Sequence, residues 1–200
     1  MSTRLLLLMF DEVELLDFAG PYEVFTTANR MAARREPAEP PPFELLTASP
    51  DGRPATARAG LSLRPDVALG EAPPCDVLLV PGGVVDALLK DAALLAGLRR
   101  HSGTAQITAS ICTGAFVLAA AGLLRDAEVT THWEDADDLA RRHPDLRVRP
   151  ERRWVDNGRF VTSAGIAAGI DMSLHLVGRL TDVELARRTA RQLDVPWGGA

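Results

Sequence analysis

The sequence has little of several things that mark specialised classes of protein. Cys75 and Cys112 are its two cysteines, and they stand 37 positions apart with no C-x-x-C pair and no histidine-rich stretch nearby. A disulfide framework and a metal site are therefore not expected, and no cofactor is predicted. Lys90 is the one lysine among 22 basic residues. Together with the abundant alanine, this arginine bias suggests a bacterial genome rich in G and C.

The chain also lacks a basic stripe and a long apolar run. Its net charge is -5, and its arginines come in scattered pairs such as Arg34-Arg35 and Arg99-Arg100. Nucleic acid is therefore not expected as a partner. The longest apolar runs, such as "LLLLMF", fall short of the ~20 residues that a membrane helix needs. No charged leader with a small-residue cleavage site precedes them, so we expect a cytoplasmic protein that binds no membrane.

What is present is typical of a globular enzyme-sized domain. The 200 residues are 46% hydrophobic and 24% charged, a composition that supports one sizeable core. We find no internal repeat and no interdomain linker, so we predict a single domain over 1–200.

Buried strands alternate with amphipathic helices along most of the chain. Continuous apolar runs of strand length are typical of parallel strands covered on both faces. We expect strands at 4–10, 43–49, 75–83, 105–112 and 127–133, and helices from 21, within 84–102, after 113, at 134–144, at 165–180 and at 182–193. This order predicts an α/β sandwich with a mostly parallel central sheet. Asn157-Gly158, between two alternating runs, predicts a small β-hairpin near 152–163.

Three strand-to-loop exits carry the candidate chemistry. Ligands collect at the carboxyl ends of the strands in open α/β sheets. The exit "SICTG" places Cys112 where a strand reverses abruptly into a helix, as at a nucleophile elbow. Backbone N–H groups and the helix dipole favour a thiolate there, so we expect a lowered thiol pKa. The ordinary alternative is a small buried apolar cysteine, the reading that we adopt for Cys75.

The other two exits offer a carboxyl group and a glycine pair. Asp17 follows an apolar run and precedes Gly20-Pro21, where it either caps a helix or passes a proton beside the thiol. Gly82 and Gly83 follow a strand that we expect beside the cysteine strand. They either turn the chain or bring N–H groups to a reacting centre.

His132 is a secondary candidate. With Glu134 it forms an H-x-E pattern that could serve as the base of a Cys-His pair. Trp133 intervenes, however, and Glu134 falls in the first turn of the next helix. We therefore favour a structural hydrogen bond for His132 over catalysis.

Five ordered motifs resemble the ThiJ/PfpI superfamily, whose fold is that of class I glutamine amidotransferases. They are "LDFAGPYEVF" at 16–25, "DVLLVPGG" at 76–83, "SICTGAFVLAAAGLL" at 110–124, "TTHW" at 130–133 and "SAGIAAGIDMSL" at 163–174. The match covers about residues 4–193. The D-x-x-G-P and C-T-G motifs look most like the isonitrile hydratase branch and the effector domain of related AraC-type regulators.

The resemblance implies a flavodoxin-like fold, a homodimer and a small-molecule substrate. Carried over, Cys112 attacks the terminal carbon of an isonitrile, and Asp17 supplies the proton to form a thioimidate, from which water releases an N-substituted formamide. The Gly83 backbone and Thr113 would border the site. The substrate pocket would include Gly20, Gly165 and Ile166.

The same residues also bear on other functions. Many superfamily members have histidine after the cysteine where this chain has Thr113, which argues against protease-like and glutaminase-like activity. Glyoxalase or deglycase members generally have glutamate where this chain has Asp17. The chain stops soon after a helix ending near Leu193, so we expect no DNA-binding module. A stand-alone small-molecule sensor or a redox sensor stays possible.

Overall fold

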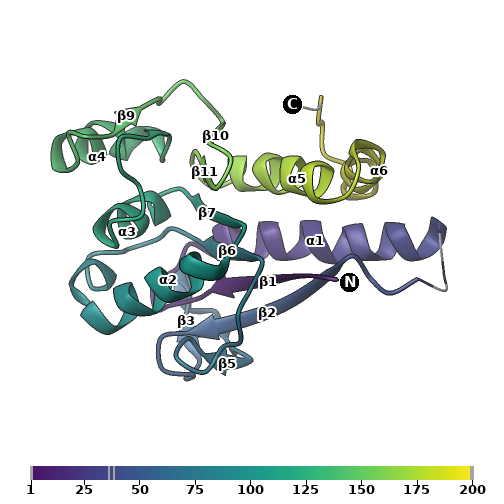
Figure 1. Ribbon diagram of the computed structural model, residues 1–200, viewed down its shortest axis with the longest axis horizontal. Coiled ribbons are helices and arrows are strands. Elements are labelled where there is room, and N and C mark those ends of the chain that lie inside the picture. The colour runs from purple at the N-terminus through teal and green to yellow at the C-terminus, as the bar shows by residue number, and fades with distance from the viewer. Residues whose placement is uncertain (1, 36, 38, 199–200) are drawn as a thin grey trace.

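A seven-stranded sheet forms the centre of the computed structural model, which describes residues 2–35, 37 and 39–198. Figure 1 shows the sheet between layers of helices. The strand order is β10-β11-β7-β6-β1-β2-β5, and every neighbouring pair except β10-β11 is parallel. The strands are β1 (Thr3–Leu8), β2 (Phe43–Ser49), β5 (Val67–Ala68), β6 (Val77–Val80), β7 (Ile107–Ile111), β10 (Trp154–Asp156) and β11 (Phe160–Ser163).

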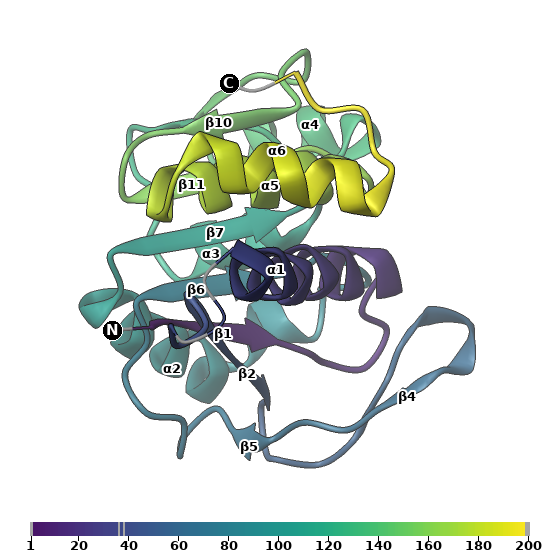
Figure 2. The same ribbon diagram turned by 90° about the vertical axis from the view of Figure 1, so that its right-hand side faces the viewer.

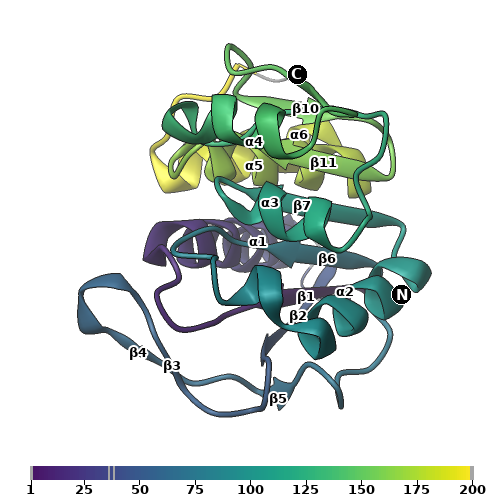
Figure 3. The same ribbon diagram turned by 90° about the vertical axis from the view of Figure 1, so that its left-hand side faces the viewer.

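Helices cover both faces of this sheet. In Figure 2, α1 (Leu15–Arg35), α5 (Ala168–Leu180) and α6 (Val183–Leu193) lie in front of it. Figure 3 shows the other side, with α2 (Ala92–Thr104), α3 (Gly114–Ala120) and α4 (Ala136–Arg142). The predicted three-layer α/β arrangement is confirmed. Within the described ranges, no helix is long and apolar enough to cross a bilayer.

Two small sheets lie outside the central one. They pair β3 (Ala55–Thr56) with β4 (Ser62–Leu63), and β8 (Glu128–Val129) with β9 (Arg147–Val148).

Apolar runs account for the central strands. Leu5, Leu6, Leu7 and Leu8 of β1 are each at most 1% exposed. Successive side chains of a strand point to opposite faces of the sheet, so the burial of all four shows that both faces of β1 are covered, as its unbroken apolar run predicts. The expected neighbours β6 and β7 also pair in parallel, with Val80 opposite Ser110. Parallel pairing brings the carboxyl ends of β1, β6 and β7 to one edge of the sheet.

The predicted hairpin is confirmed and extends the main sheet. β10 and β11 pair antiparallel around Asn157 and Gly158, and Gly158 adopts a positive φ of 81°, as a tight hairpin turn requires. β11 also pairs in parallel with β7, so Ser163 lies opposite Ile111. The hairpin thereby brings the segment after Ser163 to the strand that ends at the cysteine.

Two predicted elements were wrong. The first helix begins at Leu15 rather than at residue 21, and Pro21 lies inside it. The expected strand at 127–133 shrinks to β8, outside the main sheet. The Thr130 N–H donates to Thr162 Oγ1 at 2.9 Å, and Thr131 Oγ1 donates to the Cys112 carbonyl at 2.8 Å. These threonines join loops through side-chain bonds instead of extending a strand.

Candidate active site

The three exits singled out in the sequence meet at the carboxyl edge of the sheet. A Cβ atom placed on Gly82 would lie 2.7 Å from Thr113 N and 2.8 Å from Asp17 Oδ2. The loop before α1 is fixed to the glycine pair by backbone bonds from Glu14 N–H to Gly82 O at 2.9 Å and from Val84 N–H to Glu12 O at 3.0 Å. Any larger residue at 82 would push these segments apart.

Cys112 sits on the tight turn between β7 and α3. Its φ is +54°, a left-handed conformation that is uncommon for residues other than glycine. The turn is held by the Thr131 hydroxyl on the Cys112 carbonyl and by the Cys112 N–H, which donates to Ser163 O at 3.2 Å. A Cβ atom on Gly114 would lie 2.3 Å from Val80 O, so glycine is required there. Cys112 itself is 7% exposed.

Asp17 lies in the first turn of α1 and is 1% exposed. Its Oδ2 accepts the Gly82 N–H at 3.0 Å. Its buried Oδ1 has no hydrogen-bond partner among the described residues, and the neighbouring Cys112 thiol lowers the pKa of the carboxyl. A buried carboxyl with one oxygen unengaged is costly for stability, and such groups are concentrated at functional sites.

Burial sets the protonation of this pair. It raises the pKa of Asp17 from 3.8 to about 7, and Glu14 adds to the rise, while the Gly82 N–H and the Cys112 thiol oppose it. Burial and then the charge of Asp17 raise the pKa of Cys112 to about 12, against the N–H groups of Thr113 and Ile166. The predicted lowering of the thiol pKa was wrong because burial and the carboxylate outweigh the amide donors. The resting cysteine is a thiol beside a carboxyl group that titrates near neutrality.

The backbone donors differ from those expected. The Gly83 N–H donates to Thr113 Oγ1 at 2.9 Å, and the Gly82 N–H is used by Asp17. The Gly83 amide is therefore engaged and does not serve as the predicted charge-stabilising donor. The N–H groups of Thr113 and Ile166 interact with the Cys112 sulfur instead. The sequence placed Ile166 at the pocket but missed its role as a donor; this residue has a positive φ of 46°.

A cavity of about 290 Å³ opens onto Cys112. It is lined by Glu14, Arg58, Gly83, Cys112, Thr113, His132, Glu134, Asp135 and Ile166. The sequence singled out most of these residues, but not Glu14, Arg58 or Asp135. Arg58 was missed because it lies in a segment of short extended pieces whose path no periodicity indicates.

Two glycines predicted to line the pocket lie elsewhere. Gly20 faces Ile170, whose Cγ1 would be 3.2 Å from a Cβ atom on Gly20, so this glycine lets α1 approach α5. Gly165 lies against the His132 ring and lines an adjoining cavity of about 410 Å³ that shares His132 and Ile166 with the first one.

His132 has local partners. Its Nδ1 accepts the Glu134 N–H at 3.4 Å and lies 3.6 Å from Asp135 Oδ2. It lines the Cys112 cavity, yet no hydrogen bond joins it to the thiol among the described residues. The bond to Glu134 agrees with the expected structural role. Among all the residues that the structure describes, no cluster of His, Cys, Asp and Glu is arranged to hold a metal ion.

Comparison with known proteins finds relatives that match most of this chain. Residues 3–179 match the profile of the DJ-1/PfpI family. The chain is 35% identical over 196 residues to an isonitrile hydratase of Pseudomonas putida, a match that covers 97% of this chain and 79% of that protein. It is 31% identical to the transcriptional regulator GbdR of Pseudomonas aeruginosa, covering 90% of this chain and 47% of the regulator.

Solved structures agree on the fold. A crystal structure of a ThiJ/PfpI family protein from Pseudomonas syringae superposes with a TM-score of 0.83 at 28% identity, covering 97% of this chain and 75% of that one. DJ-1beta of Drosophila melanogaster gives a TM-score of 0.84 at 20% identity, covering 98% of this chain and 100% of that one. The predicted flavodoxin-like sandwich is confirmed.

Proposed function

Since this chain belongs to the DJ-1/PfpI family, we propose that it is a cysteine-dependent lyase that hydrates isonitriles to N-substituted formamides. The observation that carries the proposal is the buried pair of Cys112 and Asp17, in which the carboxyl group has a pKa of about 7. A general acid–base works best when its pKa lies near the working pH. The similarity to an isonitrile hydratase supports this choice of substrate.

The first half-reaction adds the thiol across the terminal carbon of the isonitrile. As the Cys112 sulfur attacks this carbon, the thiol proton moves to the Asp17 carboxylate. Asp17 then delivers the same proton to the carbon, so that one C–S and one C–H bond form and the C–N triple bond becomes a double bond. The N–H groups of Thr113 and Ile166 stabilise the negative charge that develops on sulfur. The product is a thioimidate on Cys112.

The second half-reaction consumes one water. Its oxygen adds to the thioimidate carbon, and one of its protons goes to nitrogen. The tetrahedral adduct then collapses with cleavage of the C–S bond. The hydroxyl proton returns to the sulfur through Asp17 while the carbonyl forms. The N-substituted formamide leaves and the thiol is restored, so isonitrile plus water accounts for every atom of the product.

Two other functions have specific support. Reactive carbonyls are a second substrate class, because a thiol beside a buried carboxylic acid also suits glyoxalase or deglycase chemistry. A small-molecule sensor is the alternative that the likeness to GbdR favours. Aspartate at position 17, where glyoxalase-type members generally have glutamate, supports the hydratase over the first of these.

One panel of assays separates the three. The purified protein, Cys112→Ala and Asp17→Ala are each given an aryl isonitrile and methylglyoxal. The proposal expects formamide from the wild type and at least a hundredfold less from both variants. Lactate formation without formamide would identify a glyoxalase. Inactivity toward both, with saturable metabolite binding, would identify a sensor.

The proposal extends to assembly and location. We propose a bacterial, cytoplasmic homodimer, on the basis of the resemblance to the family. Light scattering of the purified protein and fractionation of the producing cells test the two statements, and a monomer or an exported protein would refute them.

A further inference from the structure

The cavity that opens onto Cys112 carries an excess of acidic groups. Glu14, Glu134 and Asp135 line it, and Arg58 is its one arginine or lysine among the residues that the structure describes. Arg58 Nη1 lies 3.5 Å from Glu14 Oε2. This pair is neutral as a unit, so the balance of charge at the cavity depends on the two carboxyl groups that follow His132.

Glu134 and Asp135 have no arginine or lysine partner within the described part of the chain. The basic side chain beside them is His132, whose Nδ1 lies 3.8 Å from Glu134 Oε2 and 3.6 Å from Asp135 Oδ2. Burial raises the pKa of Asp135; His132 opposes this rise, and Glu134 and Asp138 add to it. Asp135 is also close enough to Cys112 to contribute to its raised thiol pKa. The two carboxylates therefore repel each other, and the charge of Asp135 also acts on the Cys112 sulfur.

Other arginines nearby do not line this cavity. Arg152 and Arg153 line the adjoining cavity, on the other side of the shared residues His132 and Ile166. Arg153 is also paired with Asp171 of α5. A molecule in contact with Cys112 thus meets the carboxylates of Glu134 and Asp135 without an unpaired guanidinium group in the same cavity.

We propose that Glu134 and Asp135 determine substrate charge: they admit isonitriles with neutral or cationic substituents to Cys112 and disfavour those that carry a carboxylate. The choice of isonitriles rests on the proposed function, whereas the charge selection is a property of the cavity. Charges that line a cleft with low-dielectric walls change the local concentration of charged ligands by tenfold or more. Salt weakens such selection, because the screening length falls to about 3 Å at 1 M ionic strength.

Alkylation of Cys112 tests the selection without any assumption about the reaction. Iodoacetate and iodoacetamide modify the same thiol and differ in charge. The ratio of the iodoacetate rate to the iodoacetamide rate is divided by the same ratio for a free thiol compound. Peptide mapping distinguishes modification of Cys112 from modification of Cys75. Any change in the thiol pKa affects both reagents alike and cancels in the ratio. We expect Glu134→Gln/Asp135→Asn to raise the ratio of iodoacetate to iodoacetamide on the order of tenfold.

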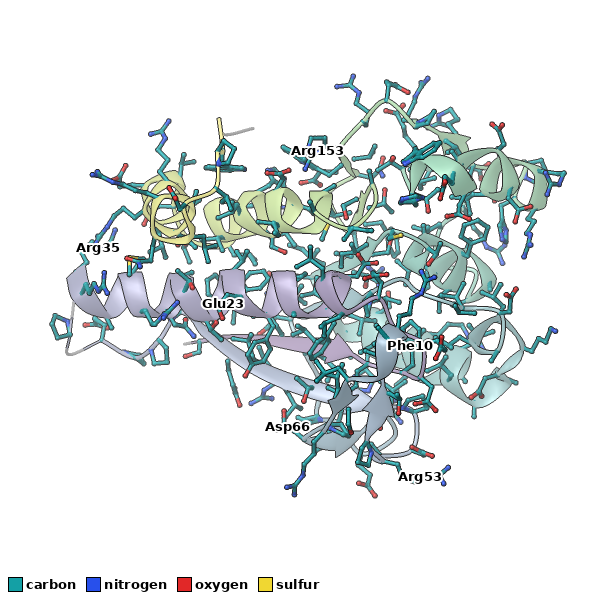
Figure 4. The ribbon with its side chains drawn as sticks, turned by 180° about the vertical axis from the view of Figure 1, so that it is seen from behind. Phe10, Glu23, Arg35, Arg53, Asp66 and Arg153 are labelled. Carbon is teal, nitrogen blue, oxygen red and sulfur yellow. The ribbon has the colours of Figure 1, made fainter. Side chains whose placement is uncertain are left out.

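A matched control removes two carboxylates far from the site. Glu39 lines a cavity together with Arg35 and Asp182, and Glu184 lies in the first turn of α6, next to Asp182. This helix is joined to the C-terminal end of α1 by the ion pair between Arg35 and Asp182, and Figure 4 shows Arg35 at the outer end of α1. Asp17 is in the first turn of α1, at the opposite end from Arg35. Because α1 has 21 residues, it is about 30 Å long. Glu39→Gln/Glu184→Gln makes the same change in net charge and should leave the ratio unchanged.

A second measurement needs no variant. In the wild type, raising the salt from about 0.01 M to about 1 M should increase the iodoacetate rate relative to iodoacetamide. A ratio that is unchanged both by salt and by Glu134→Gln/Asp135→Asn would overturn the charge selection. A matched pair of isonitriles, one with an amine and one with a carboxylate substituent, extends the test to turnover. If neither is turned over while the alkylation ratio shifts as expected, charge selection stands and the hydratase proposal fails.

Discussion

The Thr113 side chain and the Gly83 backbone bind each other twice. Thr113 Oγ1 accepts the Gly83 N–H and donates to the Gly83 carbonyl, both at 2.9 Å. The residue after Cys112 is thereby held against the loop that follows the neighbouring strand β6. Because one hydroxyl occupies both backbone groups, threonine at this position is a structural support for the turn that carries Cys112.

Thr113→Val keeps the shape of the side chain and removes both bonds. We expect a loss of about 1–3 kcal/mol in the free energy of unfolding, because the Gly83 N–H loses its partner, together with a lower kcat/KM. Urea denaturation and formamide assays measure the two effects. Thr113→Ser restores the hydroxyl and should recover most of both, whereas a serine variant as poor as the valine variant would show that the methyl group matters instead.

The pH dependence of turnover follows from the shared proton. The proposed first step needs Asp17 ionised and Cys112 protonated, and this form predominates between the two pKa values of about 7 and about 12. We therefore expect kcat/KM to rise as the pH is raised through about 7 and then to level off. Asp17→Asn should reduce kcat/KM by about a hundredfold or more. The remaining activity should no longer rise with pH. Activity that falls from pH 6 to pH 8 would contradict this assignment.

Asp17 also imposes a cost on stability that depends on pH. Its folded pKa of about 7 lies above the ordinary 3.8, so the folded state binds the proton more tightly than the unfolded state. Stability is then lost as the pH rises from about 4 to about 7, by up to roughly 4 kcal/mol. Asp17→Asn is expected to melt above the wild type at pH 8, with a smaller difference at pH 5. Equal Tm differences at both pH values would argue that Asp17 is not buried as described.

Gly165 is predicted to tolerate no side chain. A Cβ atom there would lie 2.0 Å from His132 Cδ2, so Gly165→Ala must displace the ring or the segment that carries the Ile166 N–H. We expect a loss of about 1–3 kcal/mol in stability and a drop in kcat/KM of at least tenfold. Gly103→Ala is the control, because a Cβ atom on Gly103 meets no atom within 4 Å and alanine favours the helix by about 0.5–1 kcal/mol.

Much of the fold could be predicted from the sequence, because strands and tight turns have local patterns of residue type. The unbroken leucines of β1 predicted a strand buried on both faces, and Asn157-Gly158 predicted the hairpin. The start of α1 was wrong because Pro21 was taken as a first helical position, whereas it lies in the interior of this helix. The threonines at 130 and 131 look like strand residues, but their hydroxyls and amides bond to Thr162, Arg152 and Cys112.

The chemistry of the site was harder to predict than its location. Cys112 and Asp17 could be placed at strand exits because small residues and glycines mark tight turns. The raised thiol pKa depends on how deeply two groups are buried together, a property that one sequence does not reveal. Whether a backbone N–H of Ile166 or Gly83 is available to the Cys112 sulfur depends on its other hydrogen bonds. The Gly83 N–H already donates to the Thr113 hydroxyl.

Asp17, Gly82, Cys112 and Ile166 come from four distant stretches of the chain, and the hairpin strand β11 delivers the last of them beside β7. A fragment that lacks any of these stretches therefore cannot assemble the candidate site. During refolding from denaturant, regained activity should trail the return of helical signal. A turnover assay then reports when all four stretches have come together.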